Sequence, residues 1–221
     1  MPASTPRRRA RRGEGGRLRA EILDATDLLL RERGAPSAIS IDDITRTVGC
    51  TPPALYRHFA DKHALLREVS ERHYATFAEA LNVAGSAGAS PLDALAKRGR
   101  AYIDFGLANP TAYRILFMAS EFDPVDAADA AIRVRANSAF DDQVRAVQAC
   151  IDAGQFAPGE AHTIACALWA GTHGITSLRI AKPGFDWPDL DALFSATSIA
   201  QGVGLALSAP PGACAPETAV D

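Results

Sequence analysis

Residues 50–62 read CTPPALYRHFADK, and this stretch decides the fold. Threonine is a good N-cap and proline is tolerated in the first turn, so Thr51 followed by Pro52 predicts the start of a short helix. Leu55 and Phe59 are four residues apart and would face a core, with polar side chains beside them. A small helix with apolar anchors and neighbouring hydrogen-bond donors suits the major groove of DNA.

Two further helices precede this one. Ser40 followed by Asp43 predicts a capping box that opens a second short helix, and Val48-Gly49-Cys50 predicts a tight turn after it. Further upstream, an amphipathic helix is predicted from Arg17 to Gly34, where glycine can end a helix in the left-handed conformation. Its apolar stripe is Leu18, Ile22, Ala25 and Leu29. The order is helix, helix, turn, helix.

Residues 17–66 resemble the DNA-binding domain of TetR-family transcriptional regulators. The matching positions are residues 22–34, Ser40-x-x-x-Ile44, Val48-Gly49-x-Thr51 and Leu55-Tyr56-x-His58-Phe59-x-x-Lys62-x-x-Leu65. Two departures are Thr45, where the family usually has alanine, and the Pro52-Pro53 pair that opens the third helix. The resemblance implies an all-α protein that inserts this third helix into the major groove.

A set of DNA-contacting residues follows from the resemblance and from side-chain chemistry. The set comprises Tyr56, His58 and Lys62 for phosphates, Thr51, Pro52, Ala54 and Arg57 for bases, and Arg17, Ser40 and Pro53 without an assigned role. Arg57 is the residue of this group that can make a bidentate contact to guanine, and a phosphate contact is its alternative.

The charge of the chain is unevenly distributed. The net charge of the 221 residues is −3, but residues 1–20 hold seven arginines and one acid, Glu14. A basic arm over residues 1–16 is therefore predicted, which would be disordered alone and could follow phosphates or enter a minor groove. A solvated tail without DNA contact is the alternative.

The remaining chain is predicted to be helical, which gives an all-α fold of about nine helices without strands. The expected helices run from Asp61 to about Leu81, Pro91 to Ala108, Pro110 to Ala119, Val125 to Ala153, Pro158 to Ile180 and Pro188 to Leu207, with a loop over 82–89 and a turn at 122–124. The predicted domains are 17–66 for DNA binding and 67–207 for effector binding and dimerisation, followed by a disordered tail over 208–221.

The second domain resembles a C-terminal subgroup of the same family that is named for its Trp, His and Gly. The matching stretches are Asn109-Pro110-x-x-Tyr113-Arg114-x-x-Phe117 and Trp169-x-x-x-His173-Gly174. The resemblance to the family implies that this domain holds an effector. Aromatic and long apolar residues gather in the domain, which suits a small, mainly apolar molecule. The candidates are Tyr102, Phe105, Tyr113, Phe117, Met118, Phe140, Trp169 and His173. The alternatives are core packing for each aromatic residue and a carbonyl-bonded packing role for His173.

The last two helices carry small and apolar residues that suit pairing between two copies of the chain. The dimer candidates are Leu168, Thr172, Ile175, Leu178, Phe194, Ile199 and Val203. Packing of these stripes inside one protomer is the alternative.

Other functional classes find little support in the sequence. The four cysteines are scattered without zinc or disulfide spacing, which predicts free thiols in a reducing cytoplasm. Neither a membrane-spanning apolar run of about 20 residues nor a secretory signal is found. Glu160 and His162 lack a third ligand at metal spacing, and the glycines at 13, 15 and 16 follow no strand. We therefore expect no enzyme activity, no cofactor and no metal.

These observations predict a homodimeric repressor that binds a palindromic operator in double-stranded DNA and is released by its effector. An activator of the same fold is one alternative. A helical small-molecule-binding protein whose helix-turn-helix no longer reads DNA is the other.

Overall fold

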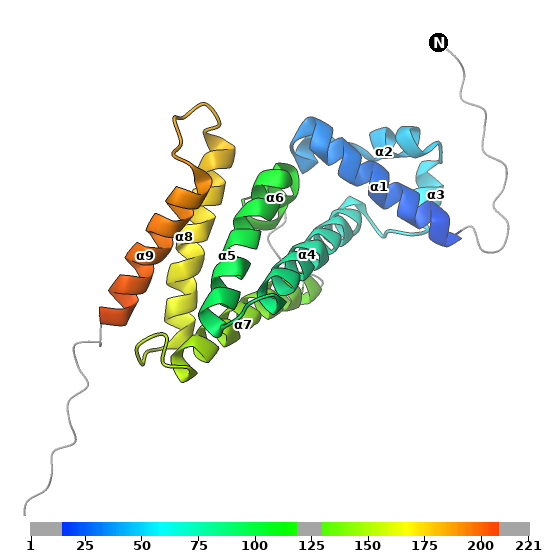
Figure 1. Ribbon diagram of the computed structural model, residues 1–221. Helices are drawn as coiled ribbons and strands as arrows, with labels where there is room; N and C mark the ends of the chain where they lie inside the picture. The colour runs from blue at the N-terminus through cyan, green and yellow to red at the C-terminus, as the bar shows by residue number, and fades with distance from the viewer. Residues whose placement is uncertain (1–14, 119–129, 208–221) are drawn as a thin grey trace, which may run out of the picture. The chain divides into compact units, whose positions relative to one another are not determined.

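The computed structural model describes residues 15–118 and 130–207, with side chains for residues 16–118 and 138–201. Both ranges are helical, and they contain nine α-helices, one short 3-10 helix and no strand (Figure 1). The elements are α1 (Gly15–Arg33), η1 (Pro36–Ala38), α2 (Ile41–Val48), α3 (Pro52–Tyr56), α4 (Lys62–Ser86), α5 (Pro91–Ala108), α6 (Pro110–Phe117), α7 (Ala130–Asp152), α8 (Ala161–Ala181) and α9 (Leu190–Leu207). The predicted all-α class is confirmed.

The chain forms two compact units, Met1–Thr76 with Asn109–Arg135 and Phe77–Ala108 with Ala136–Asp221. The division falls inside α4, so this helix begins in the first unit and ends in the second. The domain boundary predicted at residues 66/67 lies in the same helix. Residues 1–14 of the predicted arm, the turn at 122–124 and the predicted tail lie outside the described residues.

The first unit is built around one apolar core that α1, α2, α3, the start of α4 and α6 share. Its buried members are Ile22, Leu23, Leu29, Leu30, Ile39, Ile44, Leu55, Phe59, Leu65, Leu66, Val69 and Ile115. The predicted stripe of α1 faces this core, since Leu18 packs against it and Ala25 is buried. Ile115 comes from α6, which the sequence placed in the other domain.

Glycine and local capping set the ends of the short helices. The φ angle is +80° at Gly34 and +73° at Gly49, the left-handed region that favours glycine. Gly34 N donates to Leu30 O at 2.8 Å, and Gly49 N donates to Thr45 O at 2.9 Å. The capping box at Ser40 and Asp43 is present. These local predictions are confirmed.

The helix α4 begins as expected and ends later than expected. Asp61 Oδ1 accepts a hydrogen bond from Ala64 N at 2.6 Å, which caps the first turn. The helix then continues to Ser86 instead of ending near Leu81. A Cβ atom on Gly85 would lie 2.9 Å from Arg98 Cγ, so glycine at this position lets α5 approach α4 closely. Tertiary packing thus extends a segment that looked like a loop.

In the second unit, α8 and α9 lie side by side, and both begin after an acidic cap rather than at the prolines that the sequence favoured (Figure 1). The Glu160 carboxylate accepts from His162 N and Thr163 N, and Asp189 Oδ1 accepts from Asp191 N and Ala192 N. Gly154, with φ +69°, follows the end of α7 as predicted. Within 15–118 and 130–207, no helix is long and apolar enough to cross a membrane.

Candidate DNA-binding surface and ligand site

The helix α3 is anchored on one side and exposed on the other. Leu55 is 0% exposed and Phe59 is buried with it in the core of the first unit. Tyr56, 49% exposed, and Arg57, also exposed, lie next to these anchors in sequence. Thr51 caps α3 through its extended backbone, although its side chain makes no capping hydrogen bond. The five-residue helix and its C-cap therefore present the phenol of Tyr56 and the guanidinium of Arg57 to solvent.

Not every residue predicted to face DNA is exposed. Thr51 and Pro53 are exposed, whereas Pro52 and His58 are half-buried. Ala54 is only 9% exposed. Its predicted contact with bases stays a prediction.

Lys62 has partners inside the protein. Its Nζ donates to Pro36 O at 2.7 Å and to Ile39 O at 2.6 Å. These two carbonyls belong to η1 and the residue after it, so Lys62 holds the connection between α1 and α2 against the start of α4. An ammonium group has three N–H donors, and two are engaged here. These bonds favour a structural role for Lys62 over the predicted contact with a phosphate.

Ser40 and Asp43 form the centre of a capping network at the start of α2. Ser40 Oγ accepts from Asp43 N at 3.1 Å and donates to Asp43 Oδ2 at 2.7 Å. Arg33 Nη1 donates to the same carboxylate oxygen at 2.7 Å, and Arg46 Nη1 donates to Oδ1 at 3.2 Å. The hydrogen bond from Arg33 and those from Ser40 hold the pKa of Asp43 well below its ordinary value.

Removal of this network is expected to destabilise the first unit. Ser40→Ala should lower the free energy of unfolding by about 0.5–2 kcal/mol, the usual effect of losing an N-cap. Because the pKa of Asp43 is depressed in the fold, its ionised carboxylate stabilises the fold above about pH 4. This stabilisation is lost as the pH falls further. The difference between the urea midpoints of the wild type and Asp43→Asn should therefore be full at pH 7 and shrink progressively as the pH falls from about 4 towards the depressed pKa of Asp43. Asp42→Asn, a neighbouring exposed carboxylate, is the control and should match the wild type at pH 7.

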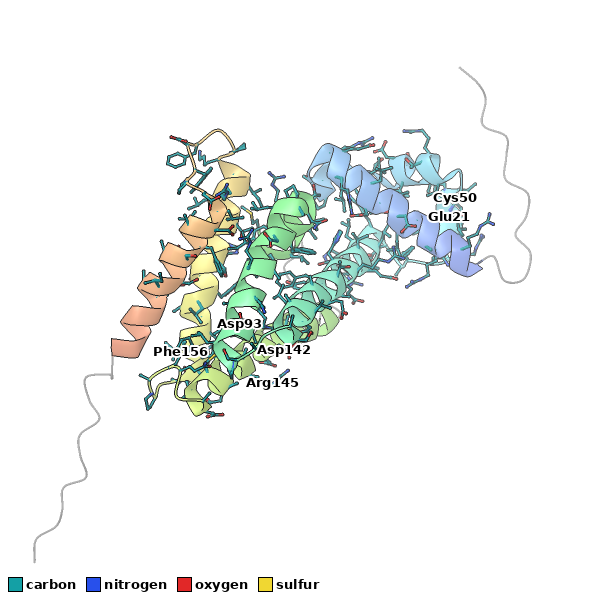
Figure 2. All side chains as sticks on the ribbon, viewed as in Figure 1. Glu21, Cys50, Asp93, Asp142, Arg145 and Phe156 are labelled. Atoms are coloured by element: carbon teal, nitrogen blue, oxygen red, sulfur yellow. The ribbon has the colours of Figure 1, made fainter. Side chains whose placement is uncertain are left out.

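Of the arginine-rich segment, the structure describes the side chains of Arg17 and Arg19. Arg17 Nε donates to Glu21 Oε1 at 3.0 Å, and the Arg17 side chain is largely exposed. Figure 2 labels Glu21 on α1. Arg19 pairs with Glu68, and its guanidinium lies 5.3 Å from the centre of the Phe59 ring. Cys50, which Figure 2 also labels, packs partly buried against the core at the turn.

The candidate effector residues belong to two different units. Tyr113, Phe117 and Met118 lie in the first unit, where Tyr113 is fully buried and its ring lies 5.0 Å from that of Phe117. Met118 is exposed. Tyr113 is therefore a core residue of the unit that carries α3. The other five candidates lie in the second unit.

Three of these five form a hydrogen-bonded group between α5 and α8. Trp169 Nε1 donates to Tyr102 Oη at 3.1 Å, and Tyr102 Oη lies 3.1 Å from His173 Nδ1. Burial lowers the pKa of His173, so the imidazole is neutral near pH 7. The Tyr102 hydroxyl therefore joins the indole of Trp169 and the imidazole of His173, and the tautomer of His173 decides which of the two donates in the second bond. Trp169 and His173 thus meet the same hydroxyl group, and their ring centroids lie 5.8 Å apart.

Aromatic rings surround this group. The ring centroid of Phe77 on α4 lies 5.3 Å from that of Tyr102 and 5.3 Å from that of Phe105. The ring centroid of Phe140 on α7 lies 5.9 Å from that of Trp169. Phe77 was not among the predicted effector residues. The group combines a mostly apolar lining with a few polar atoms, as in many small-molecule sites.

The dimer candidates differ in exposure. Leu178 and Ile199 are 52% and 64% exposed, large values for apolar residues. Leu168 packs partly against the core of the second unit, and the Phe194 ring lies near Gly99. Ile175 is buried within the protomer, and its part in a dimer surface stays a prediction. Thr172 is half-buried and donates to Leu168 O and Trp169 O. The side chain of Val203 lies outside the described part.

The described residues contain no group of three or more His, Cys, Asp or Glu side chains that could hold a metal ion. None of the three cysteines that the structure describes, Cys50, Cys150 and Cys166, is in a disulfide. Burial raises the pKa of the Cys150 thiol, which keeps it protonated near neutral pH.

Several solved structures share this fold. A protein of unknown function from Rhodococcus sp. RHA1 has 26% identity and a TM-score of 0.74, covering 92% of this chain and 100% of that chain. A transcriptional regulator of the TetR/AcrR family from Thermobifida fusca has 18% identity and a TM-score of 0.63, covering 83% and 96%. The transcriptional regulator FadR from Bacillus subtilis, in complex with stearoyl-CoA, has 14% identity and a TM-score of 0.68, covering 84% and 98%. No curated protein matches the sequence.

Two family models match separate parts of the chain. The model described as bacterial regulatory proteins of the tetR family matches residues 22–69, which include α2, α3 and the start of α4. The model described as the C-terminal domain of tetracyclin repressor-like proteins matches residues 95–198. The two matches together span more than half of the chain. The assignment to the Trp-His-Gly subgroup stays a prediction. The chain belongs to the TetR family of bacterial transcriptional regulators.

Proposed function

We propose that this regulator is a homodimeric repressor that leaves its operator when a small, mainly apolar effector binds. The observation that carries the proposal is the helix α3, whose Tyr56 and Arg57 are exposed while Leu55 fixes the helix in the core. A short helix with fixed orientation and exposed donors can place side chains on base edges and phosphates.

The exposed residues of this segment divide by chemistry. Tyr56 would donate a hydrogen bond to a phosphate, and His58 would assist from its half-buried position. Thr51, Pro53 and Arg57 would meet the groove. Ser40 lies at the start of α2, and both its hydroxyl and its backbone N–H are already engaged with Asp43.

Arg57→Ala is expected to relax the preference for one base pair while leaving the rest of the site unchanged. The loss of a bidentate contact to guanine removes about 1–3 kcal/mol of discrimination against the wrong base. Binding to a set of operator variants, each with one substituted base pair, measures this directly. Equal weakening on every sequence would instead assign Arg57 to a phosphate.

The dimer proposal is supported by the exposed apolar side chains of Leu178 on α8 and Ile199 on α9. Two symmetric copies would bury these residues and would present two copies of α3 to two half-sites of DNA. A palindromic operator follows from this symmetry.

The effector proposal is supported by the group of Tyr102, Trp169 and His173 and the rings around it. The similar fold of FadR from Bacillus subtilis holds stearoyl-CoA, which supports ligand binding by this architecture. The helix α4 is continuous from Lys62, near α3, to the region of Phe77, whose ring contacts Tyr102. An effector that displaces Phe77 would therefore act on the DNA-binding unit through one helix, with a typical coupling of about 1–3 kcal/mol.

Selection of bound sequences from a random pool of DNA duplexes tests the proposal. The purified full chain is used at about 0.15 M salt, where purely electrostatic binding is weak. An enriched palindrome supports a dimer that reads sequence, and the position of its genomic matches relative to promoters distinguishes a repressor from an activator. Without enrichment, the alternative of a ligand-binding protein with a non-reading helix-turn-helix takes its place.

A further inference from the structure

The helix α5 buries a charged side chain against α4. Arg98 is only 8% exposed, and arginine is rarely buried to this extent without a paired carboxylate. Its aliphatic stem packs against the backbone of α4, since a Cβ atom on Gly85 would lie 2.9 Å from Arg98 Cγ. The guanidinium is therefore held inside the second unit.

The hydrogen bonding of this guanidinium is incomplete. Arg98 Nη1 donates to Asn82 Oδ1 at 2.7 Å, and this acceptor is an uncharged amide. Among the residues that the structure describes, none accepts a hydrogen bond from Arg98 Nε, which is buried. A buried donor without a partner is unfavourable, more so when it carries charge.

Among the described side chains, the charge of Arg98 is also uncompensated. Asp142 of α7 attracts the guanidinium and Arg145 repels it, and burial lowers the pKa of Arg98 from its ordinary value. Asp142 is already ion-paired with Arg145, which Figure 2 labels beside it. The three side chains thus hold two cations and one carboxylate. Because arginine stays protonated in proteins, one positive charge lacks its own counter-ion in this cluster.

The apolar surface next to this charge belongs to the candidate effector site. Tyr102 lies one helical turn after Arg98 on α5, so the two side chains share a face. Phe105 is three residues further on, and the Phe77 ring contacts both Tyr102 and Phe105. A buried cation thus adjoins a row of aromatic rings.

We propose that Arg98 is the residue that selects an anionic effector, an amphipathic carboxylate whose apolar body lies against Phe77, Tyr102 and Phe105. The carboxylate would bind the side-on edge of the guanidinium formed by Nε and Nη2, a geometry that suits paired hydrogen bonds. Nη1 would keep its bond to Asn82. The inference rests on the proposed effector function and adds the charge of the ligand to it.

Binding of matched carboxylates and alcohols tests the inference. The probes are octanoate, decanoate and dodecanoate with the corresponding alcohols, below their micelle concentrations, and the fluorescence of Trp169 beside Tyr102 reports binding by the full chain. The wild type should prefer a carboxylate to its alcohol by about tenfold or more. Arg98→Gln should lose that preference and keep its affinity for the alcohol.

Lys97→Gln is the matched control. Lys97 is the adjacent cation on α5, and its Nζ pairs with Asp93 at 2.9 Å on the surface. This variant should bind carboxylates as the wild type does. Equal binding of carboxylates and alcohols by the wild type, or an unchanged preference in Arg98→Gln, overturns the inference.

A measurement without ligand separates this role from a structural one. Replacement of an uncompensated buried cation by an apolar side chain of similar length is often neutral or stabilising. Arg98→Met should therefore have a thermal midpoint equal to or above that of the wild type, and decanoate should raise the midpoint of the wild type alone. A lower midpoint for Arg98→Met would show that Arg98 holds α4 to α5 and would overturn the inference. None of these readouts uses DNA, so failure of the operator selection is a separate result.

Discussion

Leu55→Ala is expected to lower the free energy of unfolding of the first unit by about 2–5 kcal/mol, the usual range for a buried leucine. Leu55 is fully buried in a core that it shares with Ile44, Phe59 and Leu65. A helix of five residues has no stability by itself, so α3 depends on this anchor for its orientation. Urea unfolding followed by circular dichroism measures the loss, and operator binding should disappear with it.

Tyr56→Ala provides the matched comparison for Leu55→Ala. The two residues are adjacent on α3, but Tyr56 is about half exposed. Its replacement should change the free energy of unfolding by less than about 0.5 kcal/mol, as is usual for surface positions, while it weakens binding to all DNA sequences. A wild-type urea midpoint for Leu55→Ala would contradict the role of this residue as the anchor of α3.

The helix-turn-helix could be predicted because its signals are local. Gly34 and Gly49 end helices through their own φ angles, and Ser40 and Asp43 cap a helix across three residues. The apolar spacing of α1 defines a buried face without knowledge of its partner. Such features act within one or two helical turns, so they can be recognised from neighbouring residues in the sequence.

Long-range contacts could not be predicted in the same way. The extension of α4 to Ser86 depends on the approach of Arg98 to Gly85, thirteen residues earlier in the chain. Arg98 itself looks like a solvated arginine in the sequence, and only packing reveals that it is buried. The predicted starts of α8 and α9 were wrong for a different reason. Each helix begins after a carboxylate that caps its first turn, Glu160 or Asp189, and not at the nearby proline.

The candidate site was predicted by residue type more reliably than by position. Tyr102, Trp169 and His173 were selected as aromatic or polar residues of an apolar domain, and they are joined by hydrogen bonds. Tyr113 was selected for the same reason, as an aromatic residue of the predicted C-terminal domain, but it is fully buried in the first unit. Residue type predicts burial, whereas the assignment to a unit depends on the course of the chain.

Lys62→Met is expected to act on stability rather than on the contact with DNA. The Nζ atom donates to Pro36 O and Ile39 O, and these bonds hold the residues that lead into α2. Loss of a charged donor to buried or partly buried acceptors lowers the free energy of unfolding by about 1.5–3 kcal/mol. Methionine keeps the length of the side chain, so the change removes the hydrogen bonds without opening a large cavity.

Two measurements distinguish this role of Lys62 from a phosphate contact. The urea midpoint should fall, while the slope of log affinity against log salt concentration should match that of the wild type where the variant is folded. A lost phosphate contact would instead reduce the slope by about 0.9. Arg57→Met is the control, because Arg57 is an exposed cation five residues earlier and its loss should weaken DNA binding at unchanged stability. A reduced slope with an unchanged midpoint for Lys62→Met would return Lys62 to the residues that hold phosphates, because its bonds to Pro36 and Ile39 would then contribute little to folding.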